Sequence, residues 1–377
     1  MNIKVIISGG GTGGHIFPAI AIANAIKAQC PVAEILFVGA KGRMEMEKVP
    51  AAGYRIEGLT ISGFQRSFTI KNLWVPVKII LSMIKAAEII SKFKPDVVVG
   101  VGGYASGPML QTALRKKIPT LIQEQNSYPG ITNKILSKRV NKICVAYPGM
   151  EKFFPTGKIL FTGNPVRQDI SRLTEKKKDA LEYFKLSASK KTLLVIGGSL
   201  GARTINESIA GGLKQLGEKN IQLVWQTGKG YFETALKFTQ QSEPISGGMA
   251  LSGNLGWVGG FISRMDYAYA AADLVVSRAG ALSVSELCVA AKASIFIPSP
   301  NVAEDHQTKN ALSLVNNNAA LLVKDSDSRE MLVKKIIELA NDEMLINSLE
   351  KNISRLAKTN AASEIASEII QMARKVI

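Results

Sequence analysis

The chain has 377 residues, more than one average domain contains and enough for two domains with separate cores. Its 46% hydrophobic and 20% charged residues are typical of a folded globular protein and exclude the disordered and fibrous classes. The formal net charge of +17 is uneven, because residues 1–163 hold 21 Lys and Arg against 8 Asp and Glu, and the remaining residues 26 against 22. This positive N-terminal half indicates an anionic partner, such as nucleic acid, a membrane surface or a phosphorylated substrate.

The cysteines Cys30, Cys144 and Cys288 lie far apart and form neither a disulfide framework nor a CxxC metal motif. With 2 histidines in the chain, the pattern predicts no metal site. Residues 5–26 and 97–114 lack charged side chains, but glycine clusters interrupt both stretches. We therefore expect no membrane-spanning helix and no export signal, and a protein of the reducing cytoplasm.

Short apolar runs alternate with longer helical patterns, and they predict strands at residues 3–8, 34–39, 95–100, 119–123, 141–146, 192–197, 221–228, 272–277, 293–298 and 319–323. Strands that are apolar without alternation are buried on both faces, so the predicted fold class is α/β with parallel sheets. A strand, a glycine loop and a helix begin the chain and recur from Leu193 with GGSLGA, which predicts two Rossmann-like domains. The Gly, Asn and Pro of FTGNPVRQDI, residues 161–170, indicate the join, so the first domain is expected to be residues 1–162.

The first glycine loop lies in ISGGGTGGHIFPA, residues 7–19, and ends at His15. It fits the GxGxxG pattern of dinucleotide-binding loops, but the second strand ends in Gly39 and Ala40, where that fingerprint requires an acidic residue. A histidine where a Walker A loop has lysine excludes that motif. Glycine loops that open a helix favour an anion, because backbone N–H groups and the positive helix end face it. The alternative is a tight turn without a ligand.

Two further segments carry candidate chemistry. His15 lies at a helix start, which favours the neutral imidazole that a general base needs, whereas we interpret His306 as structural or as a substrate hydrogen bond. In SRAGALSVSELC, residues 277–288, a helix start could hold a diphosphate and Glu286 could accept hydrogen bonds from a ribose diol. A capped surface helix explains the same spacing equally well.

A basic helix is predicted within residues 71–94, starting near Pro76. Its lysines recur every seven residues, and because a heptad drifts only about 20° on an α-helix, the later ones form one stripe. The usual explanation is a helix with one face on the sheet and the opposite face in solvent. The cluster also fits contact with an anionic bilayer surface, through Leu73, Trp74, Lys78 and Lys85.

Segments along the whole chain, in order, resemble the MurG family of bacterial undecaprenyldiphospho-muramoylpentapeptide N-acetylglucosaminyltransferases. The matching segments are GGTGGH (10–15), PDVVVGVGGYASGP (95–108), EQNSYPGITNK (124–134), GNPVR (163–167), GGSLGARTIN (197–206), RAGALSVSE (278–286) and HQTKNA (306–311). The resemblance implies a GT-B fold, in which two Rossmann-like domains face each other across a cleft. It also implies a second domain over residues 163–345 and final helices, residues 346–377, that cross back to the first domain.

For function, the resemblance implies inverting transfer of GlcNAc from UDP-GlcNAc to the 4-hydroxyl of the muramoyl sugar of lipid I, without metal or cofactor. The product would be lipid II, made for peptidoglycan synthesis by a peripheral protein at the cytoplasmic face of the cell membrane. The implied partners are the donor, the acceptor, the anionic membrane and proteins of cell-wall synthesis and division.

Carried over residue by residue, the donor site comprises Thr12, Gly13, Gly14, Asn126, Arg167, Ser199, Ile262, Ala281, Leu282, Ser283, Val284, Ser285, Glu286 and Gln307. Glu286 would hold the ribose diol, and the helix start at Ala281 would face the diphosphate. Helix N–H donors and Arg167 can stabilise the departing UDP without a metal ion. The catalytic base would be His15, with Glu124 as second candidate, while Gln123 replaces a histidine that some family members have.

Three alternatives stay open. Another UDP-sugar-dependent lipid glycosyltransferase or a UDP-GlcNAc 2-epimerase would use similar donor segments, and dependence on an acceptor separates them. A nicotinamide-dependent dehydrogenase is disfavoured by the missing acidic residue after the second strand. A nucleic-acid-binding protein is suggested only by the charge of +17, and with 6% aromatic residues and no zinc-finger or RRM signature we expect no nucleic-acid partner.

Overall fold

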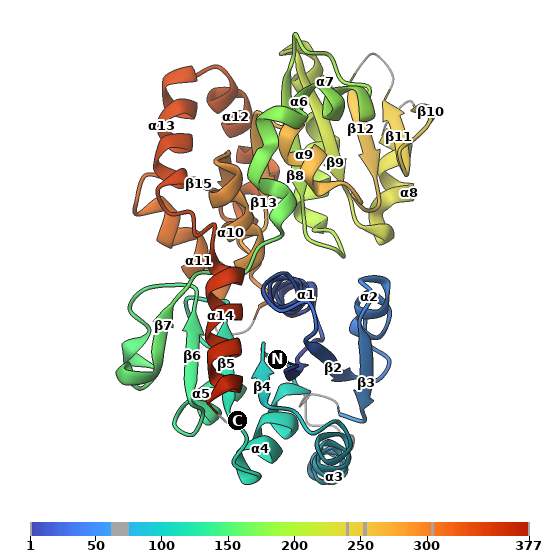
Figure 1. Ribbon diagram of the computed structural model, residues 1–377. Coiled ribbons are helices and arrows are strands. Elements are labelled where there is room, and N and C mark those ends of the chain that lie inside the picture. The colour runs from blue at the N-terminus through green and yellow to red at the C-terminus, as the bar shows by residue number, and fades with distance from the viewer. Residues whose placement is uncertain (1, 62–74, 239–240, 252–254, 303–304, 376–377) are drawn as a thin grey trace. The chain divides into compact units, whose positions relative to one another are not determined.

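The computed structural model describes residues 2–61, 75–238, 241–251, 255–302 and 305–375 (Figure 1). The chain divides into two compact units, the first being Met1–Arg167 with Lys358–Ile377 and the second Gln168–Ala357. The first division lies within the segment FTGNPVRQDI, whose glycine, asparagine and proline interrupt the pattern of strands and helices.

The described part of the first unit contains a parallel seven-stranded sheet with the order β3-β2-β1-β4-β5-β6-β7. Its strands are β1 (Lys4–Ser8), β2 (Glu34–Ala40), β3 (Arg55–Leu59), β4 (Val97–Gly100), β5 (Thr120–Glu124), β6 (Lys142–Val145) and β7 (Ile159–Phe161). The five predicted strands are confirmed as β1, β2, β4, β5 and β6. The sequence analysis missed β3, whose apolar run is broken by Glu57 and Gly58, and the three-residue β7 at the sheet edge.

Helices cover both faces of this sheet. They are α1 (Gly13–Gln29), α2 (Glu45–Ala51), α3 (Val75–Phe93), α4 (Ser106–Arg115), α5 (Ile131–Ser137) and α14 (Ala361–Arg374), with short 3-10 turns at Met150–Lys152 and Thr156–Lys158. One apolar core joins α1, α2 and α14 to the sheet, and another joins α3, α4 and α5 to its opposite face. Figure 1 shows α14, in red, with the strands of the first unit. The last helix therefore completes the core of the first unit, because its buried apolar face, including Ile365 and Ile369, packs on α1.

The described part of the second unit contains an eight-stranded sheet with the order β10-β11-β12-β9-β8-β13-β14-β15. Its strands are β8 (Lys191–Ile196), β9 (Ile221–Gln226), β10 (Gln241–Ile245), β11 (Gly248–Leu251), β12 (Gly256–Gly259), β13 (Leu274–Ser277), β14 (Ala293–Phe296) and β15 (Leu321–Leu322). The pairs from β12 to β15 are parallel, whereas β10, β11 and β12 are antiparallel neighbours. The predicted strands β8, β9, β13, β14 and β15 are confirmed, and the antiparallel edge was missed.

The helices of the second unit pack on both faces of its sheet. They are α6 (Leu173–Tyr183), α7 (Arg203–Glu218), α8 (Lys229–Phe238), α9 (Met265–Ala271), α10 (Ala281–Ala290), α11 (His306–Val315), α12 (Ser328–Ala340) and α13 (Glu343–Ser354), with 3-10 turns at Gln168–Arg172 and Asp325–Asp327. One core joins α7, α8 and α12 to the sheet, and the other joins α6, α9, α10 and α11. Helix α13 belongs to this unit, so of the final helices only α14 lies in the first.

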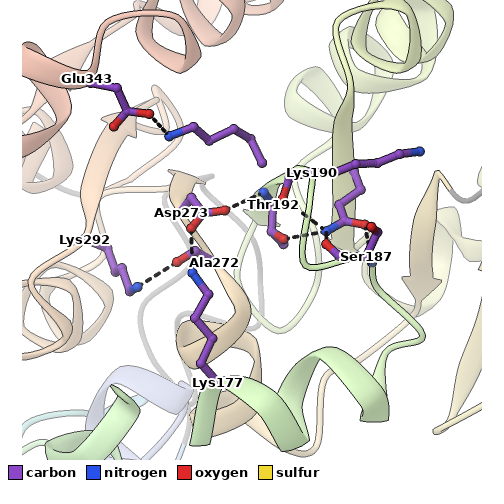
Figure 2. A network of polar contacts seen from close by, with 10 residues as sticks. Lys177, Ser187, Lys190, Thr192, Ala272, Asp273, Lys292 and Glu343 are labelled. Atoms are coloured by element: carbon purple, nitrogen blue, oxygen red, sulfur yellow. Dashed lines mark hydrogen bonds and ion pairs between the residues drawn. The ribbon is translucent and has the colours of Figure 1, made fainter. Parts of the chain in front are cut away.

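A polar network lies where β8 and β13 begin in the second sheet (Figure 2). The carboxylate of Asp273 accepts hydrogen bonds from the backbone N–H of Thr192 at 2.8 Å and from the Lys177 ammonium at 3.0 Å. Nearby, Lys292 donates to the carbonyl of Ala272 at 2.6 Å, and burial lowers the pKa of this lysine. These contacts lie at the opposite end of the strands from the glycine loops, so we interpret them as structural.

Each sheet has one topological switch point, where consecutive crossovers leave in opposite directions. In the first sheet it lies between β1 and β4, and in the second between β8 and β13. Ligands of open α/β sheets bind beyond the carboxyl ends of such strand pairs. The loops at these four strand ends contain the segments GGGTGGH, VGGYASGP, GGSLGA and RAGALS, so the fold places the predicted motifs where a ligand is expected.

Candidate functional site

The first glycine loop joins β1 to α1. Gly10 and Gly11 have φ angles of +148° and +87°, which side chains other than glycine rarely adopt. Thr12 is the N-cap of α1, and Gly13 and Gly14 form its first turn. The first N–H groups of a helix have no partner within the helix. These three residues, predicted to bind UDP-GlcNAc, therefore place backbone N–H groups at a positive helix end.

His15 is held in one orientation by the same loop. Its Nδ1 lies 3.0 Å from the carbonyl oxygen of Gly10 and 3.2 Å from the hydroxyl oxygen of Thr12. A carbonyl only accepts hydrogen bonds, so the contact with Gly10 is a hydrogen bond in the tautomer that carries its proton on Nδ1, and in that tautomer Nε2 is the basic nitrogen. The loop after β4 lies against the ring, since a Cβ at Gly102 would come within 2.8 Å of Nε2. The geometry thus presents the tautomer that a general base requires.

Glu124, at the carboxyl end of β5, is buried and fully engaged. Its Oε1 accepts hydrogen bonds from the backbone N–H of Asn126 at 3.0 Å and from the side-chain amide of Asn126 at 3.2 Å. Its Oε2 accepts from the backbone N–H of Gly130 at 3.1 Å and from the amide of Asn133 at 2.8 Å. The carboxylate therefore shapes the turn that follows β5 and orients Asn126, a predicted donor residue.

Buried amides connect β5 with the GNPVR segment. Gln123 donates to the side-chain oxygen of Asn164 at 3.0 Å, and Asn164 donates to the carbonyl of Gln125 at 3.0 Å. Gln125 donates in turn to a carbonyl in the loop after β4 at 2.8 Å. At the end of the segment, the Arg167 guanidinium lies 5.7 Å from the ring centroid of Phe17 on α1. Gln123 thus has a structural task here.

In the second unit, Gln226 connects two predicted donor segments. It ends β9 and is buried, and its amide donates to the carbonyl of Gly198 at 3.0 Å, beside Ser199 in the loop after β8. Its side-chain oxygen accepts the N–H of Ile262 at 2.9 Å. Because that N–H is engaged and the Ile262 side chain is buried, the group that Ile262 can offer a ligand is its carbonyl.

Helix α10 begins at Ala281, as the sequence predicts, after the extended residue Gly280. The side chains of Ala281 and Val284 are buried, that of Val284 in the apolar core, so these residues can contact a ligand through their backbone. The half-buried residues of the first turns are Leu282, Ser283 and Ser285.

Glu286 lies one turn further along α10 and is buried. Its Oε2 accepts a hydrogen bond from the hydroxyl of Tyr269 on α9 at 3.0 Å. Tyr269 itself is fully buried, so its hydroxyl holds the carboxylate from the core side. Sequence reasoning missed Tyr269, because an aromatic residue in an alanine-rich helix carries no sign of a polar task.

Two further contacts arrange the loop after β14. Gln307, in the first turn of α11, accepts the backbone N–H of Ser299 at 2.9 Å. Arg278, after β13, donates to the carbonyls of Ile297 at 3.0 Å and Pro298 at 3.2 Å, and pairs with Asp325. The predicted residues of the second unit therefore lie on loops and in the first turns of helices that follow neighbouring strands. Gln226 joins the loops after β8 and β12, and Arg278 joins the segments after β13 and β14.

The predicted membrane residues are only partly described. Leu73 and Trp74 lie outside the described residues, whereas Lys78 and Lys85 are half-exposed on α3, and Lys85 pairs with Glu88 at 2.9 Å. The apolar residues of α3 differ from the usual arrangement of a helix on a sheet. Val77, Ile80, Leu81 and Ile84 are 43%, 59%, 52% and 62% exposed, while the positions that face the core include Ser82, Ala86, Ile89 and Ile90. The described helices include none long and apolar enough to cross a membrane.

Comparison with known proteins decides the family. The N-terminal domain of glycosyltransferase family 28 matches residues 5–145, and the C-terminal domain of that family matches residues 192–369. The chain belongs to glycosyltransferase family 28. It is 54% identical, over 99% of both chains, to the UDP-N-acetylglucosamine–N-acetylmuramyl-(pentapeptide) pyrophosphoryl-undecaprenol N-acetylglucosamine transferase of Parabacteroides distasonis. The protein of the same name from Flavobacterium psychrophilum is 53% identical over 98% of this chain and 97% of its own.

Solved structures agree with this family 28 membership. The crystal structure of Acinetobacter baumannii MurG is 29% identical over 98% of this chain and 99% of its own, with a TM-score of 0.75. The UDP-GlcNAc 2-epimerase of Neisseria meningitidis matches with a TM-score of 0.64 over the whole of both chains at 13% identity, which shows a shared fold alone. The predicted GT-B class, with two parallel-sheet Rossmann-like domains, is confirmed.

Proposed function

We propose that the chain transfers GlcNAc from UDP-GlcNAc to the 4-hydroxyl of the muramoyl sugar of lipid I, forming lipid II for peptidoglycan synthesis. The observation that carries this proposal is the 54% identity over 99% of both chains to a transferase whose name specifies the sugar and the pyrophosphoryl-undecaprenol acceptor. The resemblance of EQNSYPGITNK to the same family favours this acceptor over that of another lipid glycosyltransferase.

The proposed reaction is a single displacement that inverts the anomeric carbon. The acceptor oxygen forms a bond to C1 of GlcNAc, and the bond between C1 and the diphosphate oxygen breaks with its electron pair leaving on UDP. The acceptor proton passes to Nε2 of His15, whose Nδ1–H is engaged by Gly10. We favour His15 over Glu124 as base because four hydrogen-bond donors already occupy the two oxygens of Glu124.

The second unit is proposed to bind most of the donor. Glu286 accepts hydrogen bonds from both hydroxyls of the ribose, and the N–H groups at the start of α10 bind the diphosphate. The Ile262 carbonyl is proposed to accept a hydrogen bond from the uracil ring of UDP. Ser199 and Gln307 are proposed to make further contacts with UDP-GlcNAc. From the first unit, Thr12, Gly13, Gly14, Asn126 and Arg167 are proposed to contribute. Their N–H and guanidinium groups stabilise the charge that develops on UDP, so we expect no metal requirement.

The first unit is also proposed to bind the membrane surface from the cytoplasmic side. The exposed apolar residues of α3, including Ile80 and Ile84, support this proposal, as do Lys78 and Lys85 on the same helix. Apolar side chains enter the headgroup region while lysines attract anionic lipid. Such contact would bring the protein to its lipid-linked acceptor, and proteins of cell-wall synthesis and division are the partners expected there.

The test is UDP release by the purified protein from UDP-GlcNAc in EDTA, with and without a lipid I analogue. We expect release that requires the acceptor and a lipid product that contains GlcNAc. Acceptor-independent release with formation of UDP-ManNAc would instead favour the epimerase. Turnover with a diacylglycerol acceptor, but not with the muramoyl lipid, would favour another lipid glycosyltransferase.

A further inference from the structure

We propose that Glu45 is a positioning residue, which holds the first glycine loop from inside and thereby fixes the tautomer and orientation of His15. The structural half of this inference stands on contacts of the first unit, and its catalytic half rests on the proposed function. Nothing in the motif GGGTGGH points to this residue, since Glu45 belongs to α2 and lies beyond β2 in the chain.

The carboxylate of Glu45 links the ends of two neighbouring strands. Its Oε2 accepts the backbone N–H of Gly11 at 2.9 Å, and its Oε1 accepts the backbone N–H of Ala40 at 3.0 Å. The residue is 1% exposed, so both hydrogen bonds are shielded from water. A hydrogen bond from a buried N–H to a charged group is roughly twice as strong as a neutral one. Glu45 therefore fastens the glycine loop after β1 to the end of β2.

Glycines make the space for this carboxylate. A Cβ at Gly10 would collide with the carboxyl group of Glu45, and a Cβ at Gly39 would collide with its Cγ. A Cβ at Gly103, in the loop after β4, would collide with the carbonyl of Gly10. Gly10 thus packs closely against both Glu45 and the loop after β4, and this packing restrains its carbonyl.

The arrangement also accounts for the residue that a dinucleotide fingerprint lacks here. In such a site an acidic residue at the end of the second strand binds a ribose, and the loop N–H groups face a pyrophosphate. In this chain the acidic group comes from Glu45, next to Gly39 and Ala40, and turns inward onto a loop N–H. One N–H group of the loop therefore binds a carboxylate of the protein instead of an external anion, and the loop holds His15.

The connection to His15 runs through one peptide. The peptide between Gly10 and Gly11 donates its N–H to Glu45, and its carbonyl, which belongs to Gly10, accepts the Nδ1–H of His15 at 3.0 Å. If the loop shifts, this hydrogen bond is lost and the neutral imidazole can populate the Nε2–H tautomer. In that tautomer Nε2 already carries a proton and cannot take one from the hydroxyl of the lipid substrate. Glu45 thus controls which ring nitrogen is available for proton transfer.

The substitution Glu45→Gln tests this with little change in volume. The two N–H groups bind different carboxylate oxygens, so an amide can accept one of them and must turn its own NH₂ toward the other. Glu45→Asp is the second variant, because it keeps the charge but is one methylene too short to reach both groups. The matched control is Glu47→Gln on the same helix, whose side chain is 79% exposed.

The first measurement is the ¹⁵N–¹H correlation spectrum of the imidazoles in histidine-labelled protein. The chain has 2 histidines, and His306→Gln assigns the signals. We expect the Nδ1–H tautomer for His15 in the wild type and in Glu47→Gln, and a growing Nε2–H population in Glu45→Gln and Glu45→Asp. This readout needs no substrate, so it decides the inference even where the proposed acceptor fails. An Nε2–H tautomer in the wild type would overturn it without any variant.

The second measurement is steady-state kinetics with UDP-GlcNAc and a lipid I analogue. For Glu45→Gln we expect kcat to fall about tenfold to a hundredfold, as for a misplaced catalytic group. UDP binding by the variant serves as the test that the second unit is intact. An unchanged kcat, or a lowered kcat with the wild-type His15 spectrum, would overturn the proposal, since the loss would then not run through the imidazole.

Discussion

Removing the hydroxyl of Tyr269 is the sharpest test of the proposed ribose site. Tyr269→Phe keeps the buried ring in the core and deletes the donor that lies 3.0 Å from Oε2 of Glu286. Both residues are buried, so water cannot readily replace this donor. A hydrogen bond to a charged group contributes about 1.5–3 kcal/mol. We expect the loss to divide between the stability of the second unit and the orientation of the carboxylate.

In numbers, a loss of about 1.5 kcal/mol in donor binding corresponds to a rise of about tenfold in the dissociation constant for UDP-GlcNAc. Each remaining 1 kcal/mol should lower the melting temperature of a unit of this size by about 2–4 °C. Calorimetric titration with UDP-GlcNAc and thermal unfolding measure the two quantities. The value of kcat at saturating donor should change little, because the ribose contact is made in both ground and transition states.

The matched control is Tyr54→Phe in the first unit, which deletes a hydroxyl that donates to Asn24 at 2.7 Å. It removes the same kind of group, and we expect no change in donor affinity. If Tyr269→Phe binds UDP-GlcNAc as tightly as the wild type and melts at the same temperature, the hydrogen bond to Glu286 contributes neither to donor affinity nor to stability. The account of how the ribose site is oriented would then be wrong.

The other predictions concern the base, the ribose, acid stability and membrane contact. In steady-state kinetics, His15→Ala should lower kcat about a hundredfold or more at an unchanged donor KM, whereas Glu286→Gln should raise the donor KM at least about tenfold. If His15→Ala instead changed KM and Glu286→Gln changed kcat, the assigned roles would be reversed. Although burial acts to raise it, hydrogen bonds from Arg264 and Lys176 hold the pKa of Asp266 below its ordinary 3.8. A pKa that is lower in the folded than in the unfolded state stabilises the fold fully above the unfolded-state pKa, and this stability is lost as the pH falls through the folded-state pKa. Lys176→Met should therefore narrow the difference between the urea-unfolding free energies at pH 6 and pH 3. An unchanged difference would contradict this coupling. Ile84→Glu should weaken sedimentation with anionic vesicles severalfold and leave donor binding intact, and wild-type vesicle affinity would argue against contact through α3.

The sequence by itself determined the fold class and the family. Buried parallel strands are apolar over most of their length, so runs such as ADLVVS can be predicted as strands from the sequence. The edge strands that the sequence did not predict are short or polar, as with RIEGL and the antiparallel hairpin β10–β11. Glycine loops could also be found, because a positive φ and a close backbone approach leave glycine as the residue that fits.

Tertiary structure alone decided how the candidate groups are held. The carboxylate of Glu45 reaches Gly11 from a different strand crossover, and Gln226 joins two loops that lie far apart in the chain. Local periodicity contains no information about such contacts, since they depend on which strand ends are neighbours in the sheet. The exposure of Ile80 and Ile84 is of the same kind, because helical spacing predicts an apolar stripe but not whether the stripe faces the core. Residue types and spacing thus indicate the candidate groups, and packing between distant segments orients them.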